Sequence, residues 1–259
     1  FLENLKFTNP YYFDIYTLGN WGNRVSGSQC YKGFDRTKHV RKLKYKPSIA
    51  IHLTFDFNVN PYMTAIVWQV EGKEIRQIDE IISKDPDNNT AATCQEFIKR
   101  YPDHEGGLFI YGDPSGRAED TRSEKGHNDF TIIMKELSKY DPVRRLDKKA
   151  PAVTTRINWI NAVFALNEGG LKILINETCK ITVQDYQNGK EAADGTKFKE
   201  KGRDPVTKIS YELYHHVTDA NDYFLCKAFA DDYRKYRTGG LETTYEDLTV
   251  RGRNSFAAY

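Results

Sequence analysis

The sequence predicts a mixed α/β domain, and three observations support this. Three strand-like segments follow one another between residues 49 and 82, separated only by short turns. After residue 88, helix-like and strand-like segments alternate along the chain. No apolar run approaches the roughly 18 residues that a membrane span needs. This order is typical of a mixed central sheet whose first three strands are antiparallel, with helices on both faces.

The first three strands are predicted to form a meander. Residues 49–57 alternate like a strand, and a turn at residues 60–62 (Asn-Pro-Tyr) leads to a second strand at residues 63–70. Residues 71–73 (Glu-Gly-Lys) then reverse the chain into a third strand at residues 74–82. Connections this short join antiparallel neighbours, because parallel neighbours need a longer crossover.

The elements that follow are marked by capping and turn residues. Asn89-Thr90 begins a helix, and Gly169-Gly170 ends another. We expect helices near residues 91–101, 129–139, 154–166, 177–186 and 217–235, and short strands near 108–112, 143–146 and 171–175. Asp194-Gly195 predicts a hairpin turn.

Composition limits the classes of partner and site. The formal net charge of +2 indicates no global attraction to nucleic acid, so a polyanion site would have to be local. The four cysteines include no C-x-x-C pair, which favours free thiols in a reducing compartment over a disulfide frame or a zinc site. No secretion signal is visible.

Three regions are expected along the chain. Residues 1–47 are predicted to form a linker or strap, rich in aromatic and turn residues and basic at its end. Residues 48–236 form the α/β domain, and residues 237–259 a polar C-terminal tail. Because the sequence opens on Phe1 and reads like the middle of a protein, we expect it to be a fragment.

Two aspartates end predicted strands. Asp56 closes an apolar strand, and no Lys or Arg lies between Lys46 and Lys73 to balance its charge. A buried carboxylate needs a compensating charge, so a distant basic residue or a metal ion is expected, unless Asp56 only caps a turn. Asp113 follows the fourth strand, although Asp-Pro-Ser-Gly is also good turn chemistry. If the two strands are neighbours, both carboxylates lie at one end of the sheet.

A third acidic group begins the last helix. His215 and His216 precede Asp219 by four and three positions, so the three share a helical face that Asp222 could extend. Carboxylates with one or two imidazoles suit a divalent metal. Thr218 or Asp219 could instead be a helix N-cap.

Converging carboxylates repel one another, and cations relieve the repulsion. Two Mg²⁺ or Mn²⁺ ions about 3.5–4 Å apart would activate a water and stabilise the leaving oxygen of a phosphodiester.

Four basic residues at alternate positions would lie on one face of a ribbon and contact phosphates, unless they only make a loop soluble. They are Lys197, Lys199, Lys201 and Arg203.

The element order is that of a ribonuclease H-like domain, and three motifs make the resemblance more specific. The motifs are Thr54-Phe55-Asp56-Phe57-Asn58, Tyr111-Gly112-Asp113-Pro114-Ser115-Gly116 and His216-Val217-Thr218-Asp219-Ala220-Asn221-Asp222-Tyr223. In this order they resemble the nuclease domain of a tailed-bacteriophage terminase large subunit, and the resemblance covers nearly the whole chain.

The resemblance implies a metal-dependent endonuclease that cuts concatemeric viral DNA during packaging. Asp56 and Asp113 would match two metal ligands, and Asp219 the acid of the late-helix Asp-Ala motif. Many relatives carry an acidic residue where this chain has His215. Whether His215, His216, Asp219 or Asp222 completes the metal site therefore stays open; His216 is our fourth candidate ligand.

The resemblance also implies partners and a location. Double-stranded DNA, an ATPase domain of the same subunit, a portal and a small terminase subunit are expected, in the cytoplasm of an infected or prophage-carrying bacterium. The chain has no G-x-x-x-x-G-K-[ST] phosphate loop, so no ATP site is expected in it. The alternatives are another ribonuclease H-like nuclease (a resolvase, transposase or ribonuclease) and a non-catalytic docking module of the packaging machine.

Overall fold

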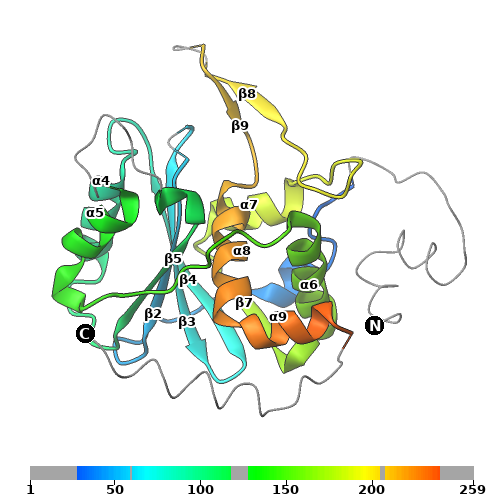
Figure 1. Cartoon of the computed structure of the whole chain (residues 1–259), viewed down its shortest axis with the longest axis horizontal. Coiled ribbons are helices and arrows are strands. Elements are labelled where there is room, and N and C mark those ends of the chain that lie inside the picture. Colours follow the sequence, from blue (N-terminus) through cyan, green and yellow to red (C-terminus); the bar gives the residue numbers. More distant parts are fainter. Residues whose placement is uncertain (1–27, 59, 118–127, 205–207, 240–259) are drawn as a thin grey trace, which may run out of the picture.

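The computed structural model describes residues 28–58, 60–117, 128–204 and 208–239. Within these residues a seven-stranded sheet forms the centre of the molecule (Figure 1). Its strands are β1 (Val40–Arg41), β2 (Ile51–Asp56), β3 (Met63–Glu71), β4 (Glu74–Ser83), β5 (Leu108–Gly112), β6 (Val143–Arg144) and β7 (Lys172–Asn176). They lie in the order β1-β7-β4-β3-β2-β5-β6.

The directions of the strands confirm the predicted mixed sheet. β2, β3 and β4 form the antiparallel meander. The remaining pairs, β2 with β5, β5 with β6, β4 with β7 and β7 with β1, are parallel. The carboxyl ends of β2 and β5 therefore meet at one edge of the sheet.

Helices cover both faces of this sheet. They are α3 (Arg36–His39), α4 (Thr90–Arg100), α5 (Asp129–Glu136), α6 (Val153–Leu166), α7 (Lys180–Asn188), α8 (His216–Ala228) and α9 (Ala230–Arg237). Figure 1 shows α4 and α5 on one face, and α6, α8 and α9 on the other. None of the helices in the described part of the chain is long and apolar enough to cross a bilayer.

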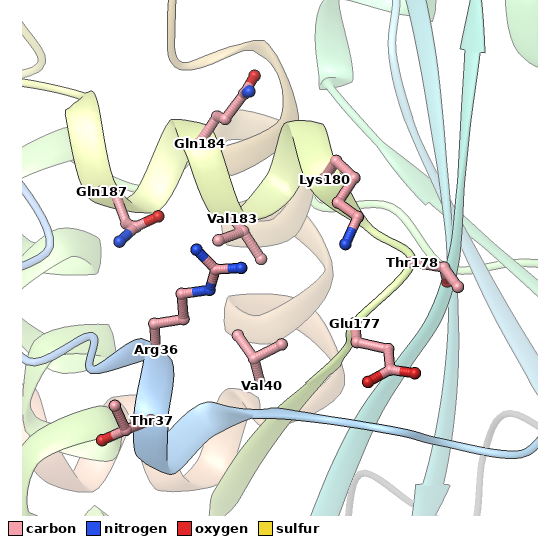
Figure 2. Close-up of a pocket in the computed structure, with 9 residues that line it drawn as sticks. All are labelled: Arg36, Thr37, Val40, Glu177, Thr178, Lys180, Val183, Gln184 and Gln187. Carbon is pink, nitrogen blue, oxygen red and sulfur yellow. The ribbon is translucent and has the colours of Figure 1, made fainter.

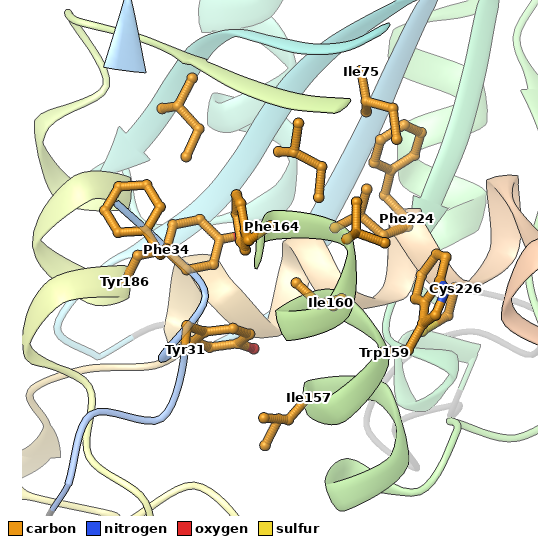
Figure 3. Close-up of a cluster of buried hydrophobic side chains, with 14 of the residues drawn as sticks. Tyr31, Phe34, Ile75, Ile157, Trp159, Ile160, Phe164, Tyr186, Phe224 and Cys226 are labelled. Carbon is orange, nitrogen blue, oxygen red and sulfur yellow. The ribbon is translucent and has the colours of Figure 1, made fainter. Parts of the chain in front are cut away.

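The side-chain alternation of β2 divides the interior into two cores. Ile51, Leu53 and Phe55 pack in the core beneath α4 and α5. The intervening residues face α8, because successive side chains of a strand point to opposite faces. The core on that side joins α6, α7 and α8 (Figure 3). The Thr54 hydroxyl lies there and donates a 2.8 Å hydrogen bond to the Ala220 carbonyl of α8. Asp56, two residues later, lies on the same side.

The helix predicted at residues 217–235 is two helices. Phe229 leaves the helical region, with φ −114° and ψ 42°, and separates α8 from α9. After this break, Tyr233 of α9 packs against Trp159 of α6, with ring centroids 5.3 Å apart. The apolar pattern runs through both helices because both pack on the same core, so it could not reveal the break.

Part of the predicted linker packs into the domain. Cys30, Tyr31 and Phe34 are buried in the core with α6 and α7. β1 extends the sheet beyond β7. These residues therefore add a short helix, an edge strand and core side chains to the domain predicted to begin at residue 48. Residues 1–27 of the predicted strap and residues 240–259 of the predicted tail lie outside the described residues.

A second, two-stranded sheet lies apart from the central one. Its strands are β8 (Lys201–Arg203) and β9 (Ser210–Glu212), which pair antiparallel. In Figure 1 this hairpin projects beyond the amino-terminal end of α8. The predicted turn at Asp194-Gly195 is present, but it joins only an isolated bridge between Glu191 and Lys197. The extended hairpin comes later in the chain than expected.

Candidate active site

Asp56 and Asp113 lie at the ends of neighbouring strands, at one edge of the sheet. Asp56 is the last residue of β2, and β5 ends at Gly112, which is paired with Phe55. The backbone N–H of Asp113 continues this pairing by donating to the Phe55 carbonyl over 3.3 Å. The backbones of these two aspartates therefore lie at the ends of adjacent strands, as the sequence predicted.

α8 covers both aspartates from one side. The Tyr223 hydroxyl of α8 donates a 3.2 Å hydrogen bond to Asp113 Oδ2. Asp113 Oδ1 accepts a 2.8 Å bond from the Ser115 backbone N–H, so the turn chemistry seen in the sequence is also present. Both oxygens of Asp113 therefore have a neutral donor.

Asp56 is buried beside a histidine. Only 4% of Asp56 is exposed, and burial raises the pKa of its carboxyl. Its Oδ2 lies 3.5 Å from His216 Nδ1 and accepts a 2.9 Å hydrogen bond from the Asn58 amide. Burial works to lower the pKa of His216, but the hydrogen bonds with Asp56 and the Glu212 carbonyl raise it above its usual value. His216 therefore acts as a partner of Asp56 in this arrangement.

His215 lies elsewhere. It is 3% exposed and adopts a left-handed backbone conformation, φ 83°, in the turn between β9 and α8. Its ring packs so closely on Gly189 that a Cβ there would lie 2.5 Å from its Cε1. Burial lowers the pKa of His215 to about 3. Of the two candidate histidines, His216 is the one that contacts Asp56.

Asp219 is held by two basic side chains. Its Oδ1 accepts a 2.9 Å hydrogen bond from Lys197 Nζ and also contacts the Arg156 guanidinium. The side chain of Asp219 is 29% exposed. Burial would raise the pKa of Asp219, but Lys197 and Arg156 together lower it. The charge that balances this third acidic group is therefore provided by the protein.

Asp222 is fully buried in the same network. Its Oδ1 accepts a 2.7 Å hydrogen bond from the Tyr31 hydroxyl. Its Oδ2 forms ion pairs with Arg156 Nε at 2.9 Å and Lys197 Nζ at 2.8 Å. Asp222 thus binds the same two cations as Asp219, from the inner side.

The predicted basic ribbon is divided by the structure. Lys197 is only 8% exposed, because its ammonium reaches inward to the two α8 carboxylates. Lys199 is exposed and pairs with Glu212 across the base of the hairpin at 2.7 Å. Lys201 and Arg203 are exposed on β8. The period-two pattern predicted one shared face, but pairing as a strand begins only at Lys201, so Lys197 is free to point into the domain.

Sequence reasoning missed several residues that hold this site. Arg156, Tyr31, Asn58 and Tyr223 contact the acidic side chains, yet none was predicted to have this role. A signal existed for Arg156, which is 3% exposed on the buried face of α6, a face that is apolar except for Arg156 and Asn161. A buried arginine requires an acidic partner, which could have been sought among the aspartates.

A cavity of the described residues lies away from these side chains. It has a volume of about 660 Å³ and lies between α3 and α7, where Arg36 and Lys180 point toward it (Figure 2). None of the predicted site residues lines it.

The fit of the acidic residues to a divalent metal is partial. Among the described residues, no group of three or more His, Cys, Asp or Glu side chains is arranged to hold a metal ion. In the same part of the chain, Asp56 and Asp113 form no ion pair with Lys or Arg, whereas Asp219 forms two. The strand-end pair suits a cation, but the predicted set of three does not.

Comparison with solved structures identifies the fold. The large terminase of a thermophilic bacteriophage matches with a TM-score of 0.59 and 17% identity, over 87% of this chain and 50% of that one. The P22 large terminase nuclease domain matches with a TM-score of 0.55 and 12% identity, over 82% of this chain and 98% of that one. The chain has the fold of a large-terminase nuclease domain.

This result confirms the predicted resemblance and the ribonuclease H-like fold class. The shared fold accounts for almost all of the P22 domain but only about half of the terminase from the thermophilic phage. The chain therefore spans about half the length of that terminase. By sequence alone, no protein-family model and no curated protein matches the chain.

Proposed function

We propose that this chain is a metal-dependent DNA endonuclease that cuts viral DNA concatemers during genome packaging. The observation that carries the proposal is the position of Asp56 and Asp113 at the carboxyl ends of two adjacent parallel strands. No described Lys or Arg forms an ion pair with either carboxylate. The terminase nuclease fold supports the choice of DNA as substrate.

Asp56 and Asp113 would hold the divalent cation, Mg²⁺ or Mn²⁺. When bound there, such an ion would activate a water molecule and stabilise the leaving oxygen of a phosphodiester. The chain's own contribution is to position the two carboxylates. Asn58 and His216 fix Oδ2 of Asp56, and Tyr223 fixes Oδ2 of Asp113.

The hairpin beside this site would bind the DNA backbone. Lys199, Lys201 and Arg203 are exposed near the amino-terminal end of α8. Lys199 also lies close enough to Asp219 and Asp56 for their charges to raise its pKa, after the larger effect of Glu212. Phosphate contacts of this kind position a duplex without reading its sequence. Lys197 is buried and has no part in this contact.

The remaining predictions follow from this function. Because the chain spans about half of the thermophilic phage's terminase, the ATPase motor would belong to another part of the subunit. Of the predicted strap, residues 28–47 belong to the domain, so residues 1–27 would join the two. The portal and small terminase subunit would be partners. The site of action would be the cytoplasm of the infected bacterium.

Plasmid nicking tests the proposal. With Mn²⁺ or Mg²⁺, the 259-residue chain should convert supercoiled plasmid to nicked and linear forms. Asp56→Asn and Asp113→Asn should each reduce the rate by more than about 100-fold, since even residues that only orient a metal ligand cost roughly 10- to 100-fold. Asp103→Asn, which removes an exposed carboxylate, is the matched control and should cut normally. Equal cutting by Asp56→Asn and wild type would contradict the site assignment.

Two other functions remain as alternatives. A non-catalytic docking module is favoured by the absence, among the described residues, of a three-ligand metal group. No cutting with any divalent metal would support it. Another ribonuclease H-like nuclease would cut, but would prefer a four-way junction or an RNA–DNA hybrid to linear double-stranded DNA in a direct comparison of the three substrates.

A further inference from the structure

The network around α8 is electrically balanced by itself. It contains two carboxylates, Asp219 and Asp222, and two basic side chains, Arg156 and Lys197. We call these four residues the α8 network. Two negative and two positive charges cancel, so the network as a whole contributes no net charge to the neighbouring site.

The cations of the α8 network are fixed in place. Arg156 is 3% exposed and Lys197 8% exposed, and each contacts both carboxylates. The Lys197 ammonium also donates a 3.2 Å hydrogen bond to the Thr218 hydroxyl. Buried charges are screened little by solvent, so these two cations offset the negative charge of Asp219 and Asp222 strongly.

Asp56 and Asp113 have the opposite charge balance. Ionised, they carry two negative charges, and the only described ion-pair partner of either is His216. One divalent cation balances two carboxylates. A second cation would need Asp219, whose Oδ1 already contacts Arg156 and Lys197. It would find no net negative charge there to hold it, because Arg156 and Lys197 already balance Asp219 and Asp222.

We propose that this site binds one divalent cation, at Asp56 and Asp113, and that Arg156 and Lys197 supply at Asp219 the positive charge that a second metal ion would otherwise provide. This inference rests on the proposed nuclease function. It makes Arg156 and Lys197 positioning residues of the acidic site and replaces the two-metal expectation drawn from the sequence.

Titration of the 259-residue chain with MnCl₂ tests the inference directly. Calorimetry should give one bound Mn²⁺ per chain. The electron paramagnetic resonance signal of the bound ion should be that of an isolated Mn²⁺, without the exchange coupling of a close pair. Two bound ions with a coupled signal would overturn the inference and leave the proposed nuclease intact. A chain that neither binds Mn²⁺ nor cuts DNA would overturn both.

Charge variants sharpen the test. Lys197→Met removes one cation and leaves the α8 network one charge negative, so a second Mn²⁺ should now bind. Adding Asp222→Asn restores neutrality, and the count should return to one. Lys199→Met is the matched control, because Lys199 is close by but outside the network, and the count should stay at one.

If circular dichroism shows that Lys197→Met does not fold, Mn²⁺ binding by Asp219→Asn tests the inference instead. In a one-metal site, Asp219→Asn should lower the affinity for Mn²⁺ by less than about tenfold, below the range for residues that orient a metal ligand, and leave the count at one. Asp113→Asn should abolish binding. Equal loss of Mn²⁺ binding in the two variants would make Asp219 a metal ligand and overturn the inference.

Discussion

The two acidic regions of this site lie side by side but are built in opposite ways. Asp56 and Asp113 end strands of the sheet and have neutral donors and one histidine around them. Asp219 and Asp222 lie on α8 and share an arginine and a lysine from other parts of the chain. The same side-chain type therefore has different partners in the two regions: the α8 pair is balanced by two basic side chains, and the strand-end pair has no Lys or Arg partner among the described residues.

The pKa shifts of the aspartates also differ between the two regions. Burial raises the pKa of Asp56, so its ionisation works against folding and that cost grows as the pH rises. The pKa of Asp219 is lowered despite burial, by Lys197 and Arg156. Its contribution to stability is present above the unfolded pKa and lost as the pH falls. The contrast between the two regions would be wrong if ionisation of their aspartates had the same effect on stability.

The largest expected effect is on stability. Asp222→Asn leaves Arg156 and Lys197 with one carboxylate between them, and breaking a buried ion pair costs about 3–5 kcal/mol. Asp56→Asn, in metal-free buffer near neutral pH, should not destabilise the chain, since it removes an unfavourable buried charge. Urea unfolding of both variants measures the difference. If both lost stability equally, the strand-end pair would be part of the structural framework.

A carboxylate between the two regions gives the next largest effect. Asp185 is buried and accepts hydrogen bonds from the Val217 and Thr218 backbone N–H groups at the start of α8. Burial raises its pKa to about 7. A raised folded pKa means stability present below the unfolded pKa and lost as the pH rises toward and through the folded pKa, here by up to about 4 kcal/mol.

Asp185→Asn should remove that loss, because the amide keeps an acceptor oxygen and cannot ionise. At about pH 8 the variant should be more stable than wild type, and at about pH 4 the two should be similar. Urea unfolding at these two values and at one between them measures this. A variant less stable than wild type at the higher pH would show that ionised Asp185 stabilises the start of α8.

A smaller effect is expected for Tyr31→Phe. The substitution removes the hydroxyl that donates to Asp222 and keeps the ring in the core. A hydrogen bond to a charged group contributes about 1.5–3 kcal/mol, so the free energy of unfolding should fall by that amount. The affinity for Mn²⁺ should be unchanged. A loss of Mn²⁺ binding would instead show that the α8 network sets the geometry of the strand-end pair.

The smallest effect concerns DNA binding. Lys201→Ala and Arg203→Ala should weaken binding uniformly across DNA sequences and lower the salt-dependence slope by about 0.9 for each phosphate that is no longer neutralised. Lys99→Ala, on α4, is the control and should change neither. Fluorescence anisotropy at several salt concentrations measures the slope. An unchanged slope in both hairpin variants would leave the DNA-binding surface elsewhere.

The features that could be predicted from the sequence depend on residues that are close together in the chain. The features that could not be predicted depend on contacts between residues that are far apart in it. The meander, the strand at residues 108–112 and the meeting of Asp56 with Asp113 follow from local periodicity and from the geometry of parallel strands. The α8 network does not, because Arg156 lies 63 residues and Lys197 22 residues before Asp219. Local spacing also misplaced Lys197, since alternation predicts one face only where a strand forms.

The hydrogen bond from Tyr31 to Asp222 has a consequence for the order of folding. It joins residues 191 positions apart, so its formation closes a long loop, which costs chain entropy. On the ribosome, β2 and β5 are complete before α8 has been made. The strand-end pair can therefore assemble on a growing chain, whereas Asp219 reaches its place only after α8 emerges and closes on the segment around Tyr31. Completion of the acidic site is thus tied to the end of synthesis of the domain.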